Sequence, residues 1–464
     1  MKKSWHIISL IGITILSACA MGSDYQRPSI EIPLSYKEDY GEWRQAVPQD
    51  ENDRGAWWSI YHDSVLDDLE QQLVLSNQNL KAAEAAYRQA NAVTDETHSA
   101  LFPSLTLNSS AGLQKGTMPT PVAADSLYGS ASWTLDVWGH IRRGVESDEA
   151  KAQASSADLA AAKLSMQAAL ATNYFDLRAQ DELKRLYDQM AEVNHKALEL
   201  AQRHYDTGIG DLTAVLAAQS QLEDVQSQSI NTSIRRAKLE HAIAALVGKT
   251  PAEFSLPPEQ FFDAVPEIPV GLPSALLERR PDIASSERMV AAANAQIGVA
   301  KAAWFPDLTL SASSGYTSMA LGKLLQISNS FWAFGPTLAE TLFDGGAREA
   351  RAKKANAAYD QSVANYRQSV LTAFQQVEDN LAASRILTEQ QKVKEKSVTH
   401  ARTIERLMAH HYMDGLESYS NVLMAKIASL EAEQSLLSIR RERLEASIGL
   451  VQALGGEWER SHKD

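Results

Sequence analysis

The residue best suited to covalent chemistry is Cys19, the only cysteine among 464 residues. It ends the tetrapeptide LSAC at 16–19, which resembles the bacterial lipobox, where the cysteine is diacylated and becomes the first residue after cleavage. Two lysines precede an apolar run over residues 5–16 that is too short for a transmembrane helix and typical of a secretory signal. The sequence therefore predicts a signal peptide over residues 1–18 and lipid attachment at Cys19.

The residues around this cysteine also predict where the chain is sorted. Diacylation would give stable anchoring, which one acyl chain does not. Ala20 follows the cysteine in place of an aspartate, and by lipoprotein sorting rules this indicates the outer membrane. We therefore expect a chain that is lipid-anchored at the cell outer membrane and extends into the periplasm. An incidental cysteine in a discarded signal is the alternative interpretation.

Residue patterns for catalysis or metal binding are absent from the sequence. The eleven histidines include no HExxH, the Gly-x-Gly at 208–210 follows a helix pattern, and no GxxxxGK[ST] or GxSxG occurs. His410 and His411 are adjacent, and neighbouring residues on a helix do not face one ligand. A single cysteine also leaves no disulfide or Cys-rich site within the chain. We expect no enzyme activity, no cofactor and no metal site; a catalytic triad assembled from residues distant in sequence is the alternative.

The net charge of the chain argues against one class of partner, nucleic acid. The 58 acidic and 44 basic residues give a net charge of −14. Removal of residues 1–18 takes away two lysines and no acid, so the mature charge is −14 − 2 = −16. Such a chain repels nucleic acid, and we expect no nucleic-acid partner.

The elements that must position any functional residue occur twice. The hexapeptide FPSLTL at 102–107 returns as FPDLTL at 305–310, and YDTG at 205–208 returns as YMDG at 412–415. Offsets of 203 and 207 residues indicate two copies of one unit. We expect a lipidated extended arm over 19–59, repeat 1 over 60–248, a proline-rich linker over 249–281, repeat 2 over 282–456 and a polar tail over 457–464.

Each copy predicts the order helix, strand, strand, long helix, shorter helix. In the first copy, one helix is expected from Trp57 to about Leu101, followed by two strands with alternating apolar and small polar residues. In the second copy, the return strand is expected over about 331–343. Residues 145–207 and 347–414 contain no glycine or proline, so each predicts a helix far longer than the mean of about 11 to 12 residues.

The alternating strands are about 9 to 11 residues long, a length typical of transmembrane barrel strands. A half-buried strand in a soluble sheet is the alternative for any single segment. The apolar positions expected to face lipid are Leu105, Leu107, Trp133, Leu135, Leu308 and Leu310. Four strands cannot close a barrel, because the smallest bacterial barrels have eight. Two chains would give eight strands and three would give twelve, and only the larger barrel has an open lumen.

Several motifs together resemble a known family. They are the lipobox, DYQRP at 24–28, Trp57-Trp58 with LDDL at 66–69, LERRPDI at 277–283, Phe305-Pro306 and LFDGG at 342–346. This set is similar to the outer membrane factor family, the TolC-like channels of efflux pumps, in the lipoprotein (NodT-like) branch that serves RND-type pumps. The resemblance implies an α+β membrane protein: a homotrimer whose twelve-stranded β-barrel continues into a long antiparallel α-helical barrel.

The resemblance also implies a function and partners. The expected protein is a passive outer membrane channel of a tripartite efflux pump, exporting small molecules such as drugs or toxic compounds. Its implied partners are outer membrane lipid, a periplasmic adaptor (membrane fusion) protein and an inner-membrane RND-type transporter. A structural coiled-coil lipoprotein that spans the periplasm without transport is the rival hypothesis, and it gives no role to the four alternating strands.

The glycine breaks at the ends of the longest helices predict the site of a gate. If the strands lie in the outer membrane, these breaks lie at the far periplasmic end, where any constriction is expected. The gate candidates are Tyr205, Gly208, Asp211, Tyr412, Asp414, Gly415 and Glu417. Similar channels carry acidic rings at positions that fall here on Ala214, Ala217, Asn421 and Met424. This departure shifts the hypothesis to the tyrosines and to Asp211 and Glu417; simple helix breaks are the alternative.

Substitution of the lipobox cysteine tests the anchor. We expect Cys19→Ser to abolish incorporation of labelled palmitate and to slow maturation, because the thiol is the acylated group. A Cys19→Ser protein that still carries the label would refute the assignment.

Overall fold

The computed structural model describes residues 20–30, 37, 55–114, 122–123, 125–261, 265–266 and 280–456. The chain folds into two compact units. Unit 1 contains Met1–Ile30, Glu84–Asp158 and Asp282–Ser369, and unit 2 contains Glu31–Ala83, Leu159–Pro281 and Val370–Asp464, each as far as these ranges are described. The predicted signal peptide, Cys19 and the C-terminal tail lie outside the described residues.

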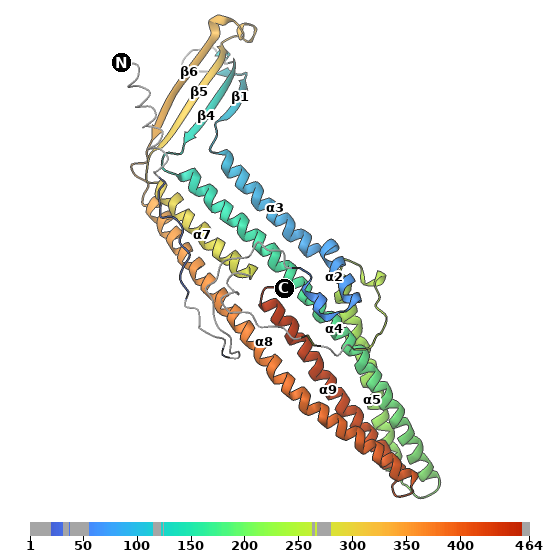
Figure 1. Cartoon of the computed structure of the whole chain (residues 1–464). Helices are drawn as coiled ribbons and strands as arrows, with labels where there is room; N and C mark the ends of the chain where they lie inside the picture. Colours follow the sequence, from blue (N-terminus) through green and yellow to red (C-terminus); the bar gives the residue numbers. More distant parts are fainter. Residues whose placement is uncertain are drawn as a thin grey trace, which may run out of the picture. The chain divides into compact units, whose positions relative to one another are not determined.

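The two halves of the chain contribute matching helices, as Figure 1 shows. The helices α3 (Gln78–Ser99) and α7 (Pro281–Ala302) have 22 residues each, α4 (His140–Asp206) and α8 (Ala347–Met413) have 67, and α5 (Leu212–Leu246) and α9 (Tyr419–Ala453) have 35. The repeat seen in the sequence is therefore a repeat of structure, and the expected doubled architecture is confirmed.

Four antiparallel strands form one sheet in unit 1, in the order β1-β4-β5-β6. They are β1 (Ser104–Ser110), β4 (Asp125–Leu135), β5 (Asp307–Ser318) and β6 (Ser330–Ala339). A separate pair, β2 (Leu113–Gln114) with β3 (Val122–Ala123), extends the first hairpin. The β4–β5 ladder joins the two halves of the chain, for example where Trp133 pairs with Leu310.

The return strand is shorter than the sequence predicted. It ends at Ala339 rather than near Phe343, because its partner begins at Asp307, which pairs with Ala339. Asp307 is preceded by Pro306, which has no backbone N–H with which to extend the strand pairing.

Equivalent aspartates begin the two longest helices, just after the strands. The Asp136 carboxylate accepts hydrogen bonds from the backbone N–H groups of Ile141 (3.0 Å) and Arg142 (2.8 Å). Asp344 accepts from those of Gly346 and Arg348, both at 3.0 Å. A carboxylate here satisfies free N–H groups of the first turn and complements the helix dipole. The same bonds lower the pKa of Asp344.

Residues 20–30 of the N-terminal arm form no helix or strand and are held by side chains of unit 1. Arg143 of α4 donates to the carbonyl oxygens of Met21 (3.2 Å) and Gly22 (3.3 Å) and bonds to Asp24 (2.9 Å). Farther along, Tyr25 donates to Glu287 of α7 at 2.5 Å. These contacts fix the residues that directly follow the predicted lipid-attachment site.

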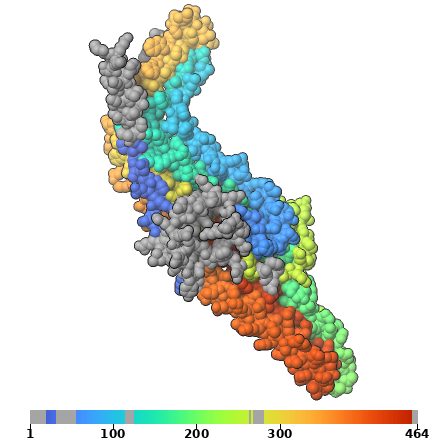
Figure 2. Space-filling model, in the orientation of Figure 1, coloured from blue at the N-terminus to red at the C-terminus, as the bar shows by residue number. Residues whose placement is uncertain are grey.

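In unit 2 the long helices contact one another in the order α5, α4, α9, α8. Ser229 of α5 donates to Asp188 of α4 at 2.6 Å, and Met190 of α4 shares an apolar cluster with Leu430 of α9. Arg402 of α8 forms an ion pair with Glu433 of α9 at 2.7 Å. Figure 2 shows α8 (orange) and α9 (red) packed along each other. The outer helices of this layer are therefore α5 and α8.

The expected helix from Trp57 to Leu101 is broken into three elements, which corrects the sequence prediction. They are η2 (Trp57–Tyr61), α2 (Ser64–Ser76) and α3. Asn77 makes the break between α2 and α3: its side-chain oxygen accepts from the N–H of Leu80 (3.0 Å), and its amide donates to the Leu246 carbonyl (2.7 Å). Asn77 therefore caps the start of α3 and also docks on the end of α5, and the second contact is a tertiary one without a local signal.

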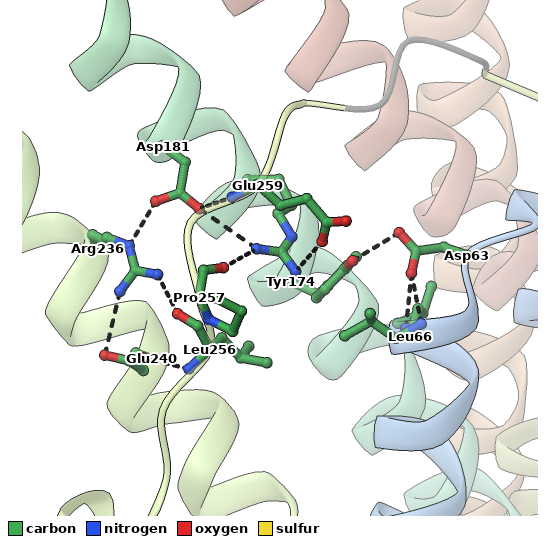
Figure 3. Close-up of polar contacts among 11 residues, drawn as sticks. Asp63, Leu66, Tyr174, Asp181, Arg236, Glu240, Leu256, Pro257 and Glu259 are labelled. Atoms are coloured by element: carbon green, nitrogen blue, oxygen red, sulfur yellow. Dashed lines mark hydrogen bonds and ion pairs between the residues drawn. The ribbon is translucent and has the colours of Figure 1, made fainter.

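One face of the layer is covered by η2, α2 and the segment that follows α5. Figure 3 shows how charged residues hold that segment. Arg178 of α4 donates to the Pro257 carbonyl at 2.8 Å, and Arg236 of α5 donates to that of Leu256 at 2.5 Å. Both arginines lie near Asp181, with Arg236 at 2.6 Å and Arg178 at 3.6 Å. Carbonyl oxygens of an extended segment thereby gain charged donors, which form stronger bonds than neutral groups.

Within α2, Glu70 is fully buried, at 0% exposure. Neither carboxyl oxygen has a hydrogen-bond partner among the described residues. Burial, with a smaller contribution from the nearby Asp67 charge, raises the pKa of Glu70 to about 9. An ionised carboxylate without partners is costly in an apolar core, so the protonated form is favoured.

This carboxyl predicts a pH-dependent stability. The pKa is higher in the folded than in the unfolded chain, so folding takes up a proton between about pH 4.5 and pH 9 and stability falls as pH rises through that window. The contribution is at most about 1.4 kcal/mol per pH unit. We expect Glu70→Gln to reduce the loss of thermal stability between pH 5 and pH 8.5, measured by circular dichroism in neutral detergent. Asp68→Asn, at an exposed neighbouring carboxyl, is the control, and equal pH dependence of parent and Glu70→Gln would contradict the prediction.

Candidate functional site

The strand register gathers the predicted lipid-facing residues on one face of the sheet. Residues paired across an antiparallel ladder lie on the same face, and side chains alternate along each strand. Leu105 pairs with Ala131, and Leu135 pairs with Leu308. All six predicted positions share one face by this rule: Leu105, Leu107, Trp133, Leu135, Leu308 and Leu310.

The fourth strand extends the same apolar face with residues that the sequence analysis did not single out. Trp332, Phe334 and Leu338 of β6 lie on it through their pairing with β5. Their side chains are exposed in the single chain, as are those of Leu105 (83%) and Leu107 (75%). The signal was the alternation along β6. An exposed apolar surface of this extent marks an interaction with lipid or protein.

The opposite face of the sheet is rich in hydroxyl groups. Asn108 donates to the Ser130 hydroxyl at 3.0 Å, and the hydroxyls of Ser110 and Ser126 lie 2.8 Å apart. On the same face and at the same end of the sheet, Tyr128 and Phe331 meet edge to face with ring centroids 5.7 Å apart. One apolar and one polar face is the pattern of a barrel strand between lipid and water.

Strands β1 and β6 are the edges of this sheet, and each pairs on one side only within the described chain. Their remaining N–H and C=O groups need partners in any environment without water. A further copy of the chain can supply them.

The first tip turn, residues 207–211, joins α4 to α5. Gly208 has φ +76°, a conformation that suits glycine, and the N–H of Ile209 returns to the His204 carbonyl at 2.9 Å. The carboxylate of Asp211 then begins α5 by accepting from the Ala214 N–H at 3.0 Å. Bonds from the Thr213 hydroxyl and from Ala214 lower the pKa of Asp211, so the turn carries a fixed negative charge.

The second tip turn, residues 414–418, repeats this geometry between α8 and α9. Gly415 has φ +75°, and the N–H of Leu416 returns to the His411 carbonyl at 2.8 Å. Here Ser418 is the N-cap of α9, and Glu417 instead accepts from the side-chain amide of Asn421 at 2.7 Å. The match between the turns explains why the YDTG and YMDG motifs recur.

The predicted gate residues thus fall into two sets, one at each turn. Tyr412 packs against Tyr419, with ring centroids 5.2 Å apart, and Tyr205 is partly exposed in the last turn of α4. Tyr419 was not predicted, since one aromatic residue at a helix start has no distinct signal. No hydrogen bond or ring contact joins the two sets within the described part of the chain.

The described residues give no sign of a metal centre, since they contain no cluster of three or more His, Cys, Asp or Glu side chains that could hold an ion. His410 and His411 lie in the last turn of α8. Among the helices that the structure describes, none combines the length and apolar character needed to cross a membrane.

In a comparison with known proteins, both halves of the chain match the same family. The family model described as "outer membrane efflux protein" matches residues 69–249 and 272–456. The pyoverdine export outer membrane protein OpmQ of Pseudomonas aeruginosa is 31% identical over 97% of this chain and 98% of its own. The probable efflux pump outer membrane protein TtgC of Pseudomonas putida is 28% identical over 96% and 94%. The solved outer-membrane channel OprN has a TM-score of 0.83 and 28% identity over 95% of this chain and all of its own.

The two faces of the sheet predict opposite effects of one added charge. Arginine at the lipid-facing midplane of a barrel costs about 2 to 4 kcal/mol. We therefore expect Leu310→Arg to reduce the yield of assembled oligomer in outer membranes, measured on gels without heating. Ser311→Arg, one residue on and on the opposite face, should assemble and mainly alter conductance. Equal tolerance of both would mean that the faces are misassigned.

Proposed function

The chain belongs to the outer membrane efflux protein family, and from this premise we propose that three copies of it form a closed export channel with its resting gate at the tip turns. The protein is the outer membrane channel component of an efflux pump. The observation that carries the trimeric channel is the four-stranded sheet with one apolar face, one hydroxyl-rich face and two incompletely paired edges. A coiled-coil lipoprotein without transport would not need such a sheet.

The number of copies follows from the strands. Three chains give twelve strands, a barrel wide enough for an open lumen, while eight strands leave an interior that side chains fill. Pairing β1 of one chain with β6 of the next completes the hydrogen bonding of every edge. This contact is head-to-tail, and such contacts close into rings.

The helical layer of unit 2 supports the same ring. Its outer helix α5 exposes Leu212, Leu216, Ile230 and Ile234. At about 100° per residue these four side chains fall within an arc of about 40° around the helix. The other outer helix, α8, exposes Leu371, Ile386, Val393, Ile404 and Leu407 within about 60°. Packing α5 of one copy against α8 of the next would cover both stripes.

The partners that we propose are a periplasmic adaptor and an inner-membrane RND-type transporter, which deliver the exported molecule. The two tip turns and the adjoining end of α8 present large apolar side chains to solvent, including Ile209 (80% exposed), Leu416 (73%) and Met413 (70%). These residues are outside the apolar clusters of unit 2 and offer the adaptor a surface.

The resting constriction that we propose lies at the same turns. In a threefold ring each turn occurs three times, so Tyr205 and the Tyr412–Tyr419 pair supply aromatic bulk near the axis. Asp211, Asp414 and Glu417 add negative charge there. Gly208 and Gly415 give the turns their shape. Outward movement of the helix tips would open this end.

Conductance in planar bilayers tests both the channel and the gate. We expect the purified protein to form discrete channels of low unit conductance, and Tyr412→Ala combined with Glu417→Ala to raise that conductance several-fold and to sensitise cells to large antibiotics. The matched control Tyr359→Ala with Glu349→Ala removes the same side-chain types near the start of α8 and should behave as the parent. Absence of any channel would refute the proposed function; a double variant that conducts like the parent would refute only the gate.

A further inference from the structure

A cavity of about 460 Å³ lies between α4, α5 and α9 of unit 2. Its apolar lining consists of Ala179 and Leu183 from α4, Leu239 from α5 and Leu437 from α9. Ligand sites in proteins have volumes of roughly 300 to 1,000 Å³ and combine an apolar surface with a few polar groups. In volume and lining this cavity meets that description.

The charged side chains of the cavity are mostly positive. Arg235 and Lys238 come from α5 and Arg441 from α9, against the single carboxylate of Asp176. Asp176 and Glu445 bind the Arg441 guanidinium and hold it in place. Arg235 and Lys238 are exposed and form no ion pair within the described residues. In a chain with a net charge of −14 this is a local reversal of sign.

The cavity opens on the face of the helical layer opposite to the covered one. On α4, Tyr174 bonds to Asp63 and Arg178 to Pro257, both on the covered face. Asp176 and Gln180 each lie two residues farther along, which is about 200° around the helix. On α9, Ser447 contacts Tyr61 on the covered face, whereas Arg441 lies six residues earlier, roughly 120° away around that helix.

In a ring of three layers one face lines the bore. The covered face carries η2, α2 and the segment after α5, and three copies of these elements would obstruct the bore if they pointed inward. They therefore lie outside, and the cavity faces the lumen. Three copies place six cationic side chains without an ion pair among the described residues, those of Arg235 and Lys238, around the path of the exported molecule.

We propose that this lumenal cavity is a transit site for amphiphilic organic anions, which names a substrate class for the channel and rests on the proposed function. The apolar body of such a molecule contacts Leu183, Leu239 and Leu437, while its carboxylate or sulfate meets Arg235 and Lys238. The buried side-chain oxygen of Gln180 also lines the cavity without a hydrogen-bond partner among the described residues, and it accepts a bond from a ligand hydroxyl or amide. Cationic amphiphiles are repelled, and neutral ones gain only the apolar contact.

Single-channel recording with three probes of equal chain length tests the site. The probes are decanoate, decanol and decyltrimethylammonium, added to one side of a planar bilayer that holds the assembled protein. We expect transient current blocks with decanoate and none with the other two. In Arg235→Gln with Lys238→Gln the block lifetime should be at least about tenfold shorter, because the loss of one of the two charge-assisted hydrogen bonds alone accounts for that factor.

The matched control is Lys392→Gln with Lys396→Gln, which removes two cations from α8, where they line a separate hollow beside Glu395. Its decanoate blocks should match those of the parent. Assembly of every variant is checked first by migration as an oligomer on unheated gels. Equal block by decanol, or unchanged block lifetimes in the α5 variant, would overturn the transit site while leaving the channel intact. Absence of channels in the parent would instead refute the proposed function.

Discussion

Backbone hydrogen bonding in a medium without water is the constraint on which this structure depends. A peptide group that leaves water unpaired costs several kcal/mol, so a sheet in lipid must close on itself. The chain folds only four strands, with β1 and β6 as edges. No rearrangement of one copy can pair both edges in so small a sheet. Several copies must therefore assemble before the sheet can reside in the membrane. Each strand already has an apolar face suited to lipid and a polar face suited to the lumen.

Because the unit is duplicated, the two halves of the chain have the same elements with matching lengths. Asp136 and Asp344 begin the paired helices α4 and α8, and Gly208 and Gly415 end them with the same turn. Equal helix lengths of 67 residues follow from equal start and stop signals. In a threefold ring such repeats approach sixfold symmetry, which allows similar contacts between halves and between copies. The departures from equivalence, such as Asp211 against Ser418 at the N-caps, are where the halves can differ in function.

Charge is distributed unevenly over a chain that is acidic as a whole. Arginines of unit 2 hold the covering segment on one face of the layer, where Arg178 and Arg236 bind carbonyl oxygens. On the other face Arg235 and Lys238 have no ion-pair partner in the described chain and stand beside an apolar lining. Unpaired cations beside apolar surface contribute little to folding, since exposed charges stabilise weakly. A role in contacting what passes through the channel accounts for them better.

Local sequence determined the features that depend on neighbours along the chain. The repeat, the long helices without glycine or proline, the tip glycines and the alternation that places Leu105 and Leu310 on one face were all predictable from it. Only the tertiary structure decided the rest, because those features need residues distant in sequence. The docking of Asn77 requires the end of α5, and the burial of Glu70 requires the elements that cover it. The cavity is formed by three helices, two from the first repeat and one from the second. Local sequence patterns do not show which segments meet in space, so they could not predict it.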